Sequence, residues 1–298
     1  MAWHRISAMV VASSFWIFNI AFHAAETEAA TWPKKLRLGV IPTEGGGESK
    51  ERFKPLAEHL QRCLGVEIEL FSASDYAGVI TAMEHKHIEC AYFGPNSYVE
   101  AQEKAGAEAL AMELDTKGNP GYTPIIIAKA GSGIQKIEDA KGKTFCFTDP
   151  NSTSGYLVPN VVFTRDLKID PATYFKEVSF SGSHGASILA VKNGKVDVAA
   201  TNDIDLGRLI DKGEVNKEEI TIIYSGNPLP GSPMCVRKDL PQSLKAAFLG
   251  ALLLINRDKE ALKKLGNGGY ATASDTDYDI IRYLKKLKEE KAQAQKGG

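Results

Sequence analysis

Short apolar runs alternate with amphipathic stretches along most of the chain. The first apolar run, residues 36–41, leads into a glycine-rich loop and then into a helix-periodic stretch at 53–64. Repetition of this strand, loop and helix unit is typical of an α/β fold. The pattern predicts strands at 36–41, 66–71, 88–93, 123–130, 144–147, 177–180, 196–201, 220–224 and 234–237, helices at 53–64, 76–84, 98–105, 154–163, 184–193 and 204–212, and helices over the remainder.

Two passages rich in proline and glycine, near residues 118–124 and 227–233, interrupt this alternation. Such passages are typical of segments that connect domains. We therefore expect an outer lobe built from residues 31–123 and 231–298, with residues 124–230 inserted as a second lobe. Ligands in this architecture bind between the lobes, where strand ends and helix N-termini face one another.

The first 30 residues differ from the rest of the chain. After His4 and Arg5, residues 6–22 carry no charge and are mostly apolar, which is typical of a secretory signal peptide. A retained membrane anchor is the weaker alternative, because polar residues interrupt a stretch that is short for a span. We expect cleavage within residues 24–30, where no cysteine is present for lipid attachment. The mature chain is thus predicted to be exported and soluble.

The composition is that of a globular protein, with 43% hydrophobic and 24% charged residues. The chain has 36 Lys and Arg against 37 Asp and Glu, so its net charge of −1 offers no basic field to attract nucleic acid. The four cysteines form no C-x-x-C motif, which favours buried free thiols over a disulfide and disfavours a metal site: Cys63, Cys90, Cys146 and Cys235. Ligand recognition must therefore depend on local geometry.

The most informative motif is Asp-Pro-Asn-Ser-Thr-Ser-Gly at residues 149–155, between a predicted strand and a predicted helix. Its hydroxyls, on Ser152, Thr153 and Ser154, and the free N–H groups of a helix N-terminus form a neutral cradle for a small anion. Simple N-capping is the alternative, but capping needs only one hydroxyl. The lysine of a nucleotide phosphate loop is absent.

His184 lies in a Ser-Gly-Ser-His-Gly turn after another predicted strand. Its imidazole can donate to the same anion and, if protonated, offset the anion's charge; a structural histidine is the alternative. No Gly-x-Ser-x-Gly elbow is present, so hydrolase chemistry is not favoured. Residues 84–89 contain two histidines and two glutamates, yet a solvated helix end explains them better than a metal site.

Several aromatic residues fall near predicted strand ends or turns. Their rings can line a cleft and their phenols can donate hydrogen bonds, although for each residue taken alone core packing is the favoured explanation. They are Tyr76, Tyr92, Phe93, Tyr98 and Tyr122.

Together with Asp-Tyr-Ala-Gly at 75–78, Gly-Tyr at 121–122 and Pro-Gly-Ser-Pro at 230–233, these motifs resemble the phosphonate-binding periplasmic component of ABC transporters, the PhnD-like family. The resemblance covers essentially the whole mature chain. It implies a type II periplasmic binding fold, in which two α/β lobes joined by two crossing strands close on a phosphonate-class ligand.

The same resemblance implies roles for individual residues and for partners. Ser152, Thr153, Ser154 and His184 would hold the phosphonyl oxygens, and Tyr76 and Tyr122 would line the cleft. The implied protein is a periplasmic monomer without cofactor, metal or catalytic residue, which delivers a phosphorus-containing anion such as phosphonate or phosphite to a membrane permease.

Two positions depart from family members that take aminoalkyl phosphonates. Asp205 is one methylene shorter than the expected glutamate, and Ser232 is uncharged where an aspartate is expected. A buried ammonium without counter-charge is costly, so we expect weak selection for amines. The alternatives are a binding protein of the same fold for phosphate or another oxyanion and, less favoured, a secreted phosphoester-processing enzyme using His184 with Asp203 or Asp205.

Overall fold

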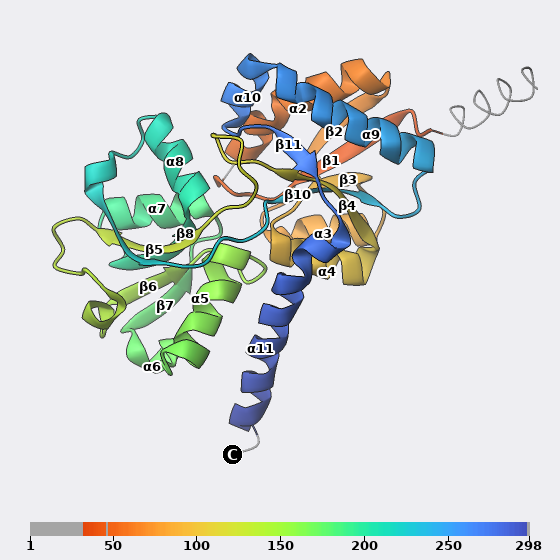
Figure 1. Cartoon of the computed structure of the whole chain (residues 1–298). Coiled ribbons are helices and arrows are strands. Elements are labelled where there is room, and N and C mark those ends of the chain that lie inside the picture. Colours follow the sequence, from red (N-terminus) through yellow and green to blue (C-terminus); the bar gives the residue numbers. More distant parts are fainter. Residues whose placement is uncertain (1–31, 46, 297–298) are drawn as a thin grey trace, which may run out of the picture.

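The computed structural model describes residues 32–45 and 47–296, so the predicted signal peptide lies outside the described residues. One sheet has the strand order β11-β4-β10-β3-β1-β2. Its strands are β1 (Lys35–Val40), β2 (Glu67–Ser72), β3 (Cys90–Tyr92), β4 (Ala107–Glu113), β10 (Pro233–Arg237) and β11 (Tyr270–Thr272). A second sheet has the strand order β7-β6-β8-β5-β9. Its strands are β5 (Pro124–Lys129), β6 (Thr144–Phe147), β7 (Glu177–Phe180), β8 (Val198–Asn202) and β9 (Ile220–Ser225). Each sheet is the centre of one lobe (Figure 1).

Helices flank each sheet. The lobe of the first sheet, here the outer lobe, contains α2 (Glu48–Leu64), α3 (Tyr76–Glu84), α4 (Pro95–Ala105), α9 (Gln242–Leu254), η5 (Ile255–Arg257), α10 (Lys259–Leu265), η6 (Asp275–Tyr278) and α11 (Asp279–Lys296). The inserted lobe contains η1 (Ile137–Ala140), the π-helix η2 (Thr153–Leu157), α5 (Val158–Val161), the π-helix η3 (Val162–Asp166), α6 (Pro171–Tyr174), α7 (His184–Lys192), α8 (Asp203–Asp211) and η4 (Lys217–Glu219).

Local sequence explains how these helices begin and pack. In α2, Phe53, Leu56 and Leu60 are buried at helical spacing, and Gly65 ends the helix in the left-handed region at a φ of 66°. Two of the helices that begin at the cleft have side-chain caps from short polar residues. Asp75 caps α3 and Asn202 caps α8, so short polar residues fix where each helix starts.

Two segments connect the lobes and pair with each other. Tyr122 N–H donates to the Leu229 carbonyl at 3.0 Å, and Leu229 N–H donates back to the Tyr122 carbonyl at 2.8 Å. Gly121, at a φ of +93°, precedes this pair, and a Cβ there would lie 2.5 Å from the Leu229 oxygen. Glycine therefore allows the two crossing segments to approach closely.

The sheet topology brings the carboxyl ends of several strands to the interface between the lobes. Strands β1 and β3 are parallel in the first sheet, and β6 and β8 are parallel in the second. Loops that leave parallel strands at one edge gather their side chains there. The polar side chains described in the next subsection gather at this edge.

The structure corrects two parts of the predicted order. The sequence pattern predicts no element at 107–113 and only helices after residue 237, but the structure has β4 and β11 there. The alanines and glutamates of β4 favour helices, yet β4 pairs antiparallel with both β10 and β11. Pairing with these neighbours outweighs local propensity.

The four cysteines are free thiols. Cys90, Cys146 and Cys235 are buried as expected, but Cys63 is exposed. Its place near the end of the amphipathic helix α2, after the last core position Leu60, explains the difference. The prediction of a buried residue was wrong for Cys63.

Helix α11 forms a further connection between the lobes. It packs against α4 of the outer lobe and against α5 and η2 of the inserted lobe (Figure 1). The Lys288 ammonium lies 4.4 Å from the centre of the Tyr156 ring, close enough for a cation–π contact. Leu157 and Val158 also belong to the buried cluster of the outer lobe. The two lobes therefore share apolar contacts as well as covalent crossings.

Candidate functional site

A small cavity of about 20 Å³ lies between the lobes at this edge of the sheets. Its volume only slightly exceeds the roughly 10–15 Å³ that one water molecule requires. All eight residues predicted for the site line it: Tyr76, Tyr122, Ser152, Thr153, Ser154, His184, Asp205 and Ser232. Tyr92, one of the aromatic residues considered as a cleft lining, also lines it. The other lining residues were not singled out by sequence reasoning: Ile41, Thr43, Gly94, Glu113, Asn202, Ile204 and Arg208.

One side of the cavity consists of neutral hydrogen-bonding groups. This neutral side is defined by Ser152, Thr153, Ser154 and His184, all of which are buried. Ser152 caps η2 by accepting a hydrogen bond from the Gly155 N–H at 3.1 Å. A Cβ on Gly155 would lie 2.2 Å from the Thr148 hydroxyl, so only glycine fits this tight turn.

The three hydroxyls differ in how much they are already used. Thr153 Oγ1 accepts from the backbone N–H of Asn96 at 2.8 Å, across the interface between the lobes. Ser154 Oγ has a longer contact, 3.4 Å from the Asn202 amide nitrogen. A hydroxyl can still donate when its oxygen accepts, so each retains a proton for an anion in the cavity.

His184 begins α7, and its ring joins the hydroxyls of two other elements. Its Nδ1 lies 3.1 Å from Thr201 Oγ1, and its Nε2 lies 3.3 Å from Ser152 Oγ. Burial lowers the pKa of this imidazole, so the ring is neutral near pH 7. A neutral ring donates one hydrogen bond but does not supply a positive charge to offset an anion.

Two tyrosines complete this part of the lining. The Tyr76 side chain is buried, and its hydroxyl has no hydrogen-bond partner among the described residues. Tyr122 hydrogen-bonds with Thr153 and Ser154. Burial raises the pKa of both phenols, so both keep their protons. An unpaired buried hydroxyl is costly, and at Tyr76 it faces the cavity.

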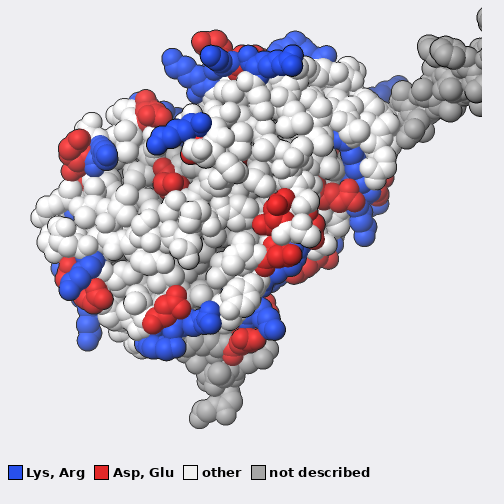
Figure 2. All heavy atoms as spheres, viewed as in Figure 1, with Lys and Arg blue, Asp and Glu red and all other residues white. Residues whose placement is uncertain are grey.

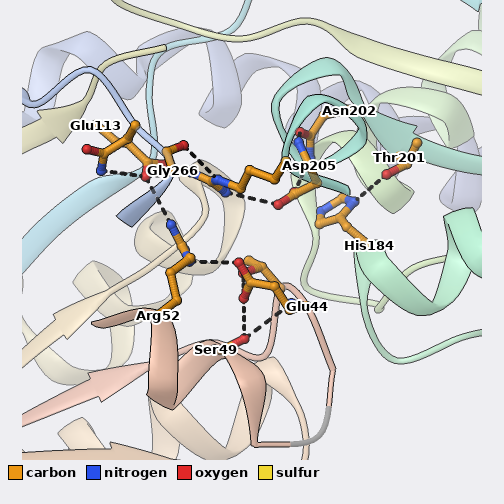
Figure 3. Close-up of polar contacts among 12 residues, drawn as sticks. Glu44, Ser49, Arg52, Glu113, His184, Thr201, Asn202, Asp205 and Gly266 are labelled. Carbon is orange, nitrogen blue, oxygen red and sulfur yellow. Dashed lines mark hydrogen bonds and ion pairs between the residues drawn. The ribbon is translucent and has the colours of Figure 1, made fainter. Parts of the chain in front are cut away.

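Buried charges lie at the other side of the cavity, where Glu113, Asp205 and Arg208 line it, and Arg52 and Glu44 extend the cluster away from the lining (Figure 3). Glu113 Oε1 accepts hydrogen bonds from Arg208 Nη2 at 2.6 Å and from Arg52 Nη1 at 3.2 Å. Arg208 Nη1 also donates to Asp205 at 3.0 Å, and Arg52 Nε lies 2.7 Å from Glu44 Oε1. We call these five residues the charged side.

The charges of this cluster stabilise one another. Burial alone would raise the pKa of Glu44, but Arg52 and Arg208 outweigh it and lower that pKa to about 2. Burial would also raise the pKa of Glu113, but the nearby charges of Arg208 and Arg52 outweigh burial. The pKa of Glu113 is therefore lowered. The carboxylates of Glu44 and Glu113 are therefore ionised at neutral pH and paired within the protein.

Arg208 is the main residue that sequence reasoning missed. The motif around 149–155 contains no arginine or lysine, which suggested a cradle without cations. Arg208 reaches the cavity from α8, three residues after Asp205. That spacing places both side chains on one helix face and was the available signal. Its partners Glu113 and Gly266 are distant in sequence and gave none.

The lobes touch next to the cavity. Gly185 N–H donates to the Thr43 carbonyl at 3.0 Å, which links α7 to the loop after β1. A Cβ on Gly185 would lie 2.4 Å from the Glu44 carbonyl oxygen. The absence of a side chain at Gly185 therefore allows the lobes to approach this closely.

The surface carries both signs of charge. Figure 2 shows Lys and Arg interspersed with Asp and Glu around a largely uncharged centre of the visible face. Within residues 32–45 and 47–296, no cluster of three or more potential metal ligands is found, and His85 and His87 have ring centres 6.2 Å apart. In this same part of the chain, no helix is both long and apolar enough to cross a bilayer.

Two α/β lobes, two paired crossings and a cavity at the strand ends define the class of protein: a type II periplasmic binding protein. The sequence profile of the family described as "ABC transporter, phosphonate, periplasmic substrate-binding protein" matches residues 38–278. The chain belongs to this family.

Individual relatives agree with this assignment. The phosphonates-binding periplasmic protein of Escherichia coli (strain K12) is 29% identical over 293 residues, covering 95% of this chain and 86% of that protein. The phosphate-import protein PhnD of Mycolicibacterium smegmatis is 29% identical and covers 87% of each chain. A binding protein component of an ABC phosphonate transporter from Pseudomonas aeruginosa has a crystal structure with a TM-score of 0.80, 30% identity and 86% coverage of each chain.

Proposed function

We propose that this protein captures a small phosphorus oxyanion, such as methylphosphonate, phosphite or phosphate, and delivers it to a membrane permease. The single observation that carries the ligand class is the Tyr76 hydroxyl, which is buried without a partner beside the three hydroxyls of the neutral side. A small anion with several acceptor oxygens would satisfy these donors together. The E. coli and P. aeruginosa relatives are named for phosphonate, and the M. smegmatis relative for phosphate.

In this proposal each lining residue has a definite role. Ser152, Thr153 and Ser154 donate to the oxygens of the anion at the start of η2, where the helix dipole adds favourable potential. His184 donates as a neutral imidazole, in keeping with its lowered pKa. Tyr76 donates through the hydroxyl that is otherwise unpaired.

The ligand is bound by closure of the two lobes, which comprise residues 31–123 with 231–298 and residues 124–230. Neutral donors and dipoles replace the water shell of the anion, and no covalent bond is made or broken. The contacts between Gly185 and Thr43 and between Asn96 and Thr153 would form only when the lobes meet. The protein acts in this role as an exported periplasmic monomer.

The size of the cavity limits the ligand. A space of about 20 Å³ is little more than one water molecule requires, so any phosphorus anion must displace the lining, and a long substituent on phosphorus would displace it most. Ser232 supplies no carboxylate for a ligand amine, and an unpaired ammonium here would be poorly solvated. We therefore expect methylphosphonate, phosphite or phosphate to bind more tightly than 2-aminoethylphosphonate.

A thermal-shift panel on the purified mature protein tests this proposal. Methylphosphonate, phosphite, phosphate, sulfate and 2-aminoethylphosphonate are compared at equal concentration, and a ligand that binds only the folded state raises the melting temperature. We expect a phosphorus anion without an amine to give the largest rise. No rise with any phosphorus anion, or a larger rise with sulfate, would refute the proposal.

Calorimetry then separates the amine hypothesis from the choice of anion. If 2-aminoethylphosphonate bound far more tightly than methylphosphonate, the hypothesis of weak amine selection would be wrong. Ser232→Asp should shift the preference toward the amine, because it adds a carboxylate to the lining.

A further inference from the structure

Arg208 lies between the two carboxylates that line the cavity. Its Nη2 donates to Glu113 at 2.6 Å and its Nη1 donates to Asp205 at 3.0 Å. The Arg208 side chain is only 5% exposed, and Asp205 is similarly buried at 9%. Water therefore does little to screen these contacts.

The same guanidinium joins the two lobes. Glu113 ends β4 of the outer lobe, whereas Asp205 and Arg208 belong to α8 of the inserted lobe. Arg208 Nε also donates to the Gly266 carbonyl of the outer lobe at 3.0 Å. The Nε, Nη1 and Nη2 atoms of Arg208 therefore all donate hydrogen bonds while the lobes are together.

These contacts determine what the carboxylates can offer a ligand. Glu113 also accepts from Tyr92 and Asn267, and Asp205 also accepts from the Asn202 amide at 2.7 Å. An ammonium group entering the cavity would have to displace or share Arg208 to reach either acid. An anion, in contrast, meets acids whose negative charge the guanidinium partly offsets.

We propose that Arg208 is a specificity-determining residue, which occupies the cavity carboxylates as an internal cation and thereby disfavours ligands that carry an ammonium group. This inference rests on the proposed function of the cavity as a site for phosphorus anions. The proposed effect of Arg208 differs from that of Ser232. At Ser232 a carboxylate is lacking, whereas beside Arg208 the carboxylates of Glu113 and Asp205 are present but already paired.

The test is the ratio of the dissociation constants of methylphosphonate and 2-aminoethylphosphonate, measured by calorimetry on the full mature chain. Arg208→Gln leaves Asp205 without a cationic partner and Glu113 with Arg52 as its one remaining guanidinium, so the ratio should move toward the amine by about tenfold or more, equivalent to about 1.4 kcal/mol. Glu113→Gln removes one acid, so that Arg52 and Arg208 face only Glu44 and Asp205, and the ratio should move away from the amine. Arg282→Gln is the matched control, because Arg282 pairs with Asp275 and Asp279, outside the cavity lining.

Opposite shifts in the two variants support the inference, and a melting curve identifies any variant that fails to fold. If Arg208→Gln does not fold, the direction of the Glu113→Gln shift decides alone. A ratio unchanged within about twofold, or shifted in the same direction by both variants, overturns the role of Arg208. If the unaltered protein binds none of the phosphorus anions, the proposed function itself is wrong, and that result is distinct from a changed ratio.

Discussion

The two sides of the cavity are both buried, yet they are built in opposite ways. Three of the four residues on the neutral side are consecutive in the chain, and the fourth, His184, joins them through Ser152. The charged side is assembled from Glu44, Arg52, Glu113 and the α8 pair Asp205 and Arg208, over both lobes. The neutral side keeps donors available to a ligand, whereas the charges of the charged side are paired with one another. We therefore expect mutations on the first to affect binding and mutations on the second to affect folding and selectivity.

The largest expected effect is on stability. Arg52→Met removes the partner of Glu44 and one partner of Glu113, which leaves buried carboxylates without enough compensation. The free energy of unfolding should fall by about 3–5 kcal/mol, as measured by urea denaturation. Lys54→Met, at an exposed ion pair on the same helix, is the control and should change stability by less than about 1 kcal/mol. Equal losses in the two variants would contradict the contrast between buried and exposed pairs.

The next effect is on binding. Ser154→Ala removes a hydroxyl that contacts the Asn202 amide nitrogen at 3.4 Å and hydrogen-bonds with Tyr122, so folding should change only slightly. Affinity for the phosphorus anion should fall by about 1.5–3 kcal/mol, the contribution of a hydrogen bond to a charged group. Calorimetry on this variant and on Ser72→Ala, at an exposed strand position, measures the difference. An affinity that matches that of Ser72→Ala would remove Ser154 from the site.

A third effect concerns the approach of the lobes. Gly185→Ala would place a methyl group 2.4 Å from the Glu44 carbonyl oxygen, so the two sides of the cavity could not meet without displacement. Overpacking of this kind costs about 1–3 kcal/mol, and it should appear as weaker ligand binding in titration calorimetry. Gly250→Ala, which has nothing within 4 Å of the new methyl group, should bind as the unaltered protein does. Unimpaired binding by Gly185→Ala would show that capture does not need this contact.

The smallest effect is a difference in pH dependence. The pKa of His184 is lowered from its ordinary 6.5, so its contribution to stability is present above that pH and is lost as pH falls below it. Glu44, with a pKa lowered from 4.5 to about 2, loses its contribution only between those two values. Urea denaturation across this range should show that His184→Gln alters the slope just below pH 6.5 and Glu44→Gln alters it below pH 4.5. Coincident changes would contradict the separation of the two sides.

The sequence predicted the neutral side better than the charged side for a physical reason. Ser152, Thr153 and Ser154 follow a strand and begin a helix, so local periodicity alone places their hydroxyls at a helix N-terminus. Glu113 is distant in sequence from Arg208, and it ends the strand β4, which local propensity did not predict. Glu113 belongs to a strand only because β4 pairs with the distant strand β10, and its ion-pair partner Arg208 is also distant in sequence. The α/β alternation was equally local and was predicted, whereas β4 and β11 depend on their neighbours in the sheet.

Helix α11 gives the C-terminus an unexpected relation to the cleft. Because it is anchored in the outer lobe and rests on α5 and η2 of the inserted lobe, opening of the lobes must either separate these surfaces or carry the helix along. Helix α11 therefore carries information on the distance between the lobes. A fluorophore on α11, paired with one on the inserted lobe, would report ligand capture without any label in the cavity.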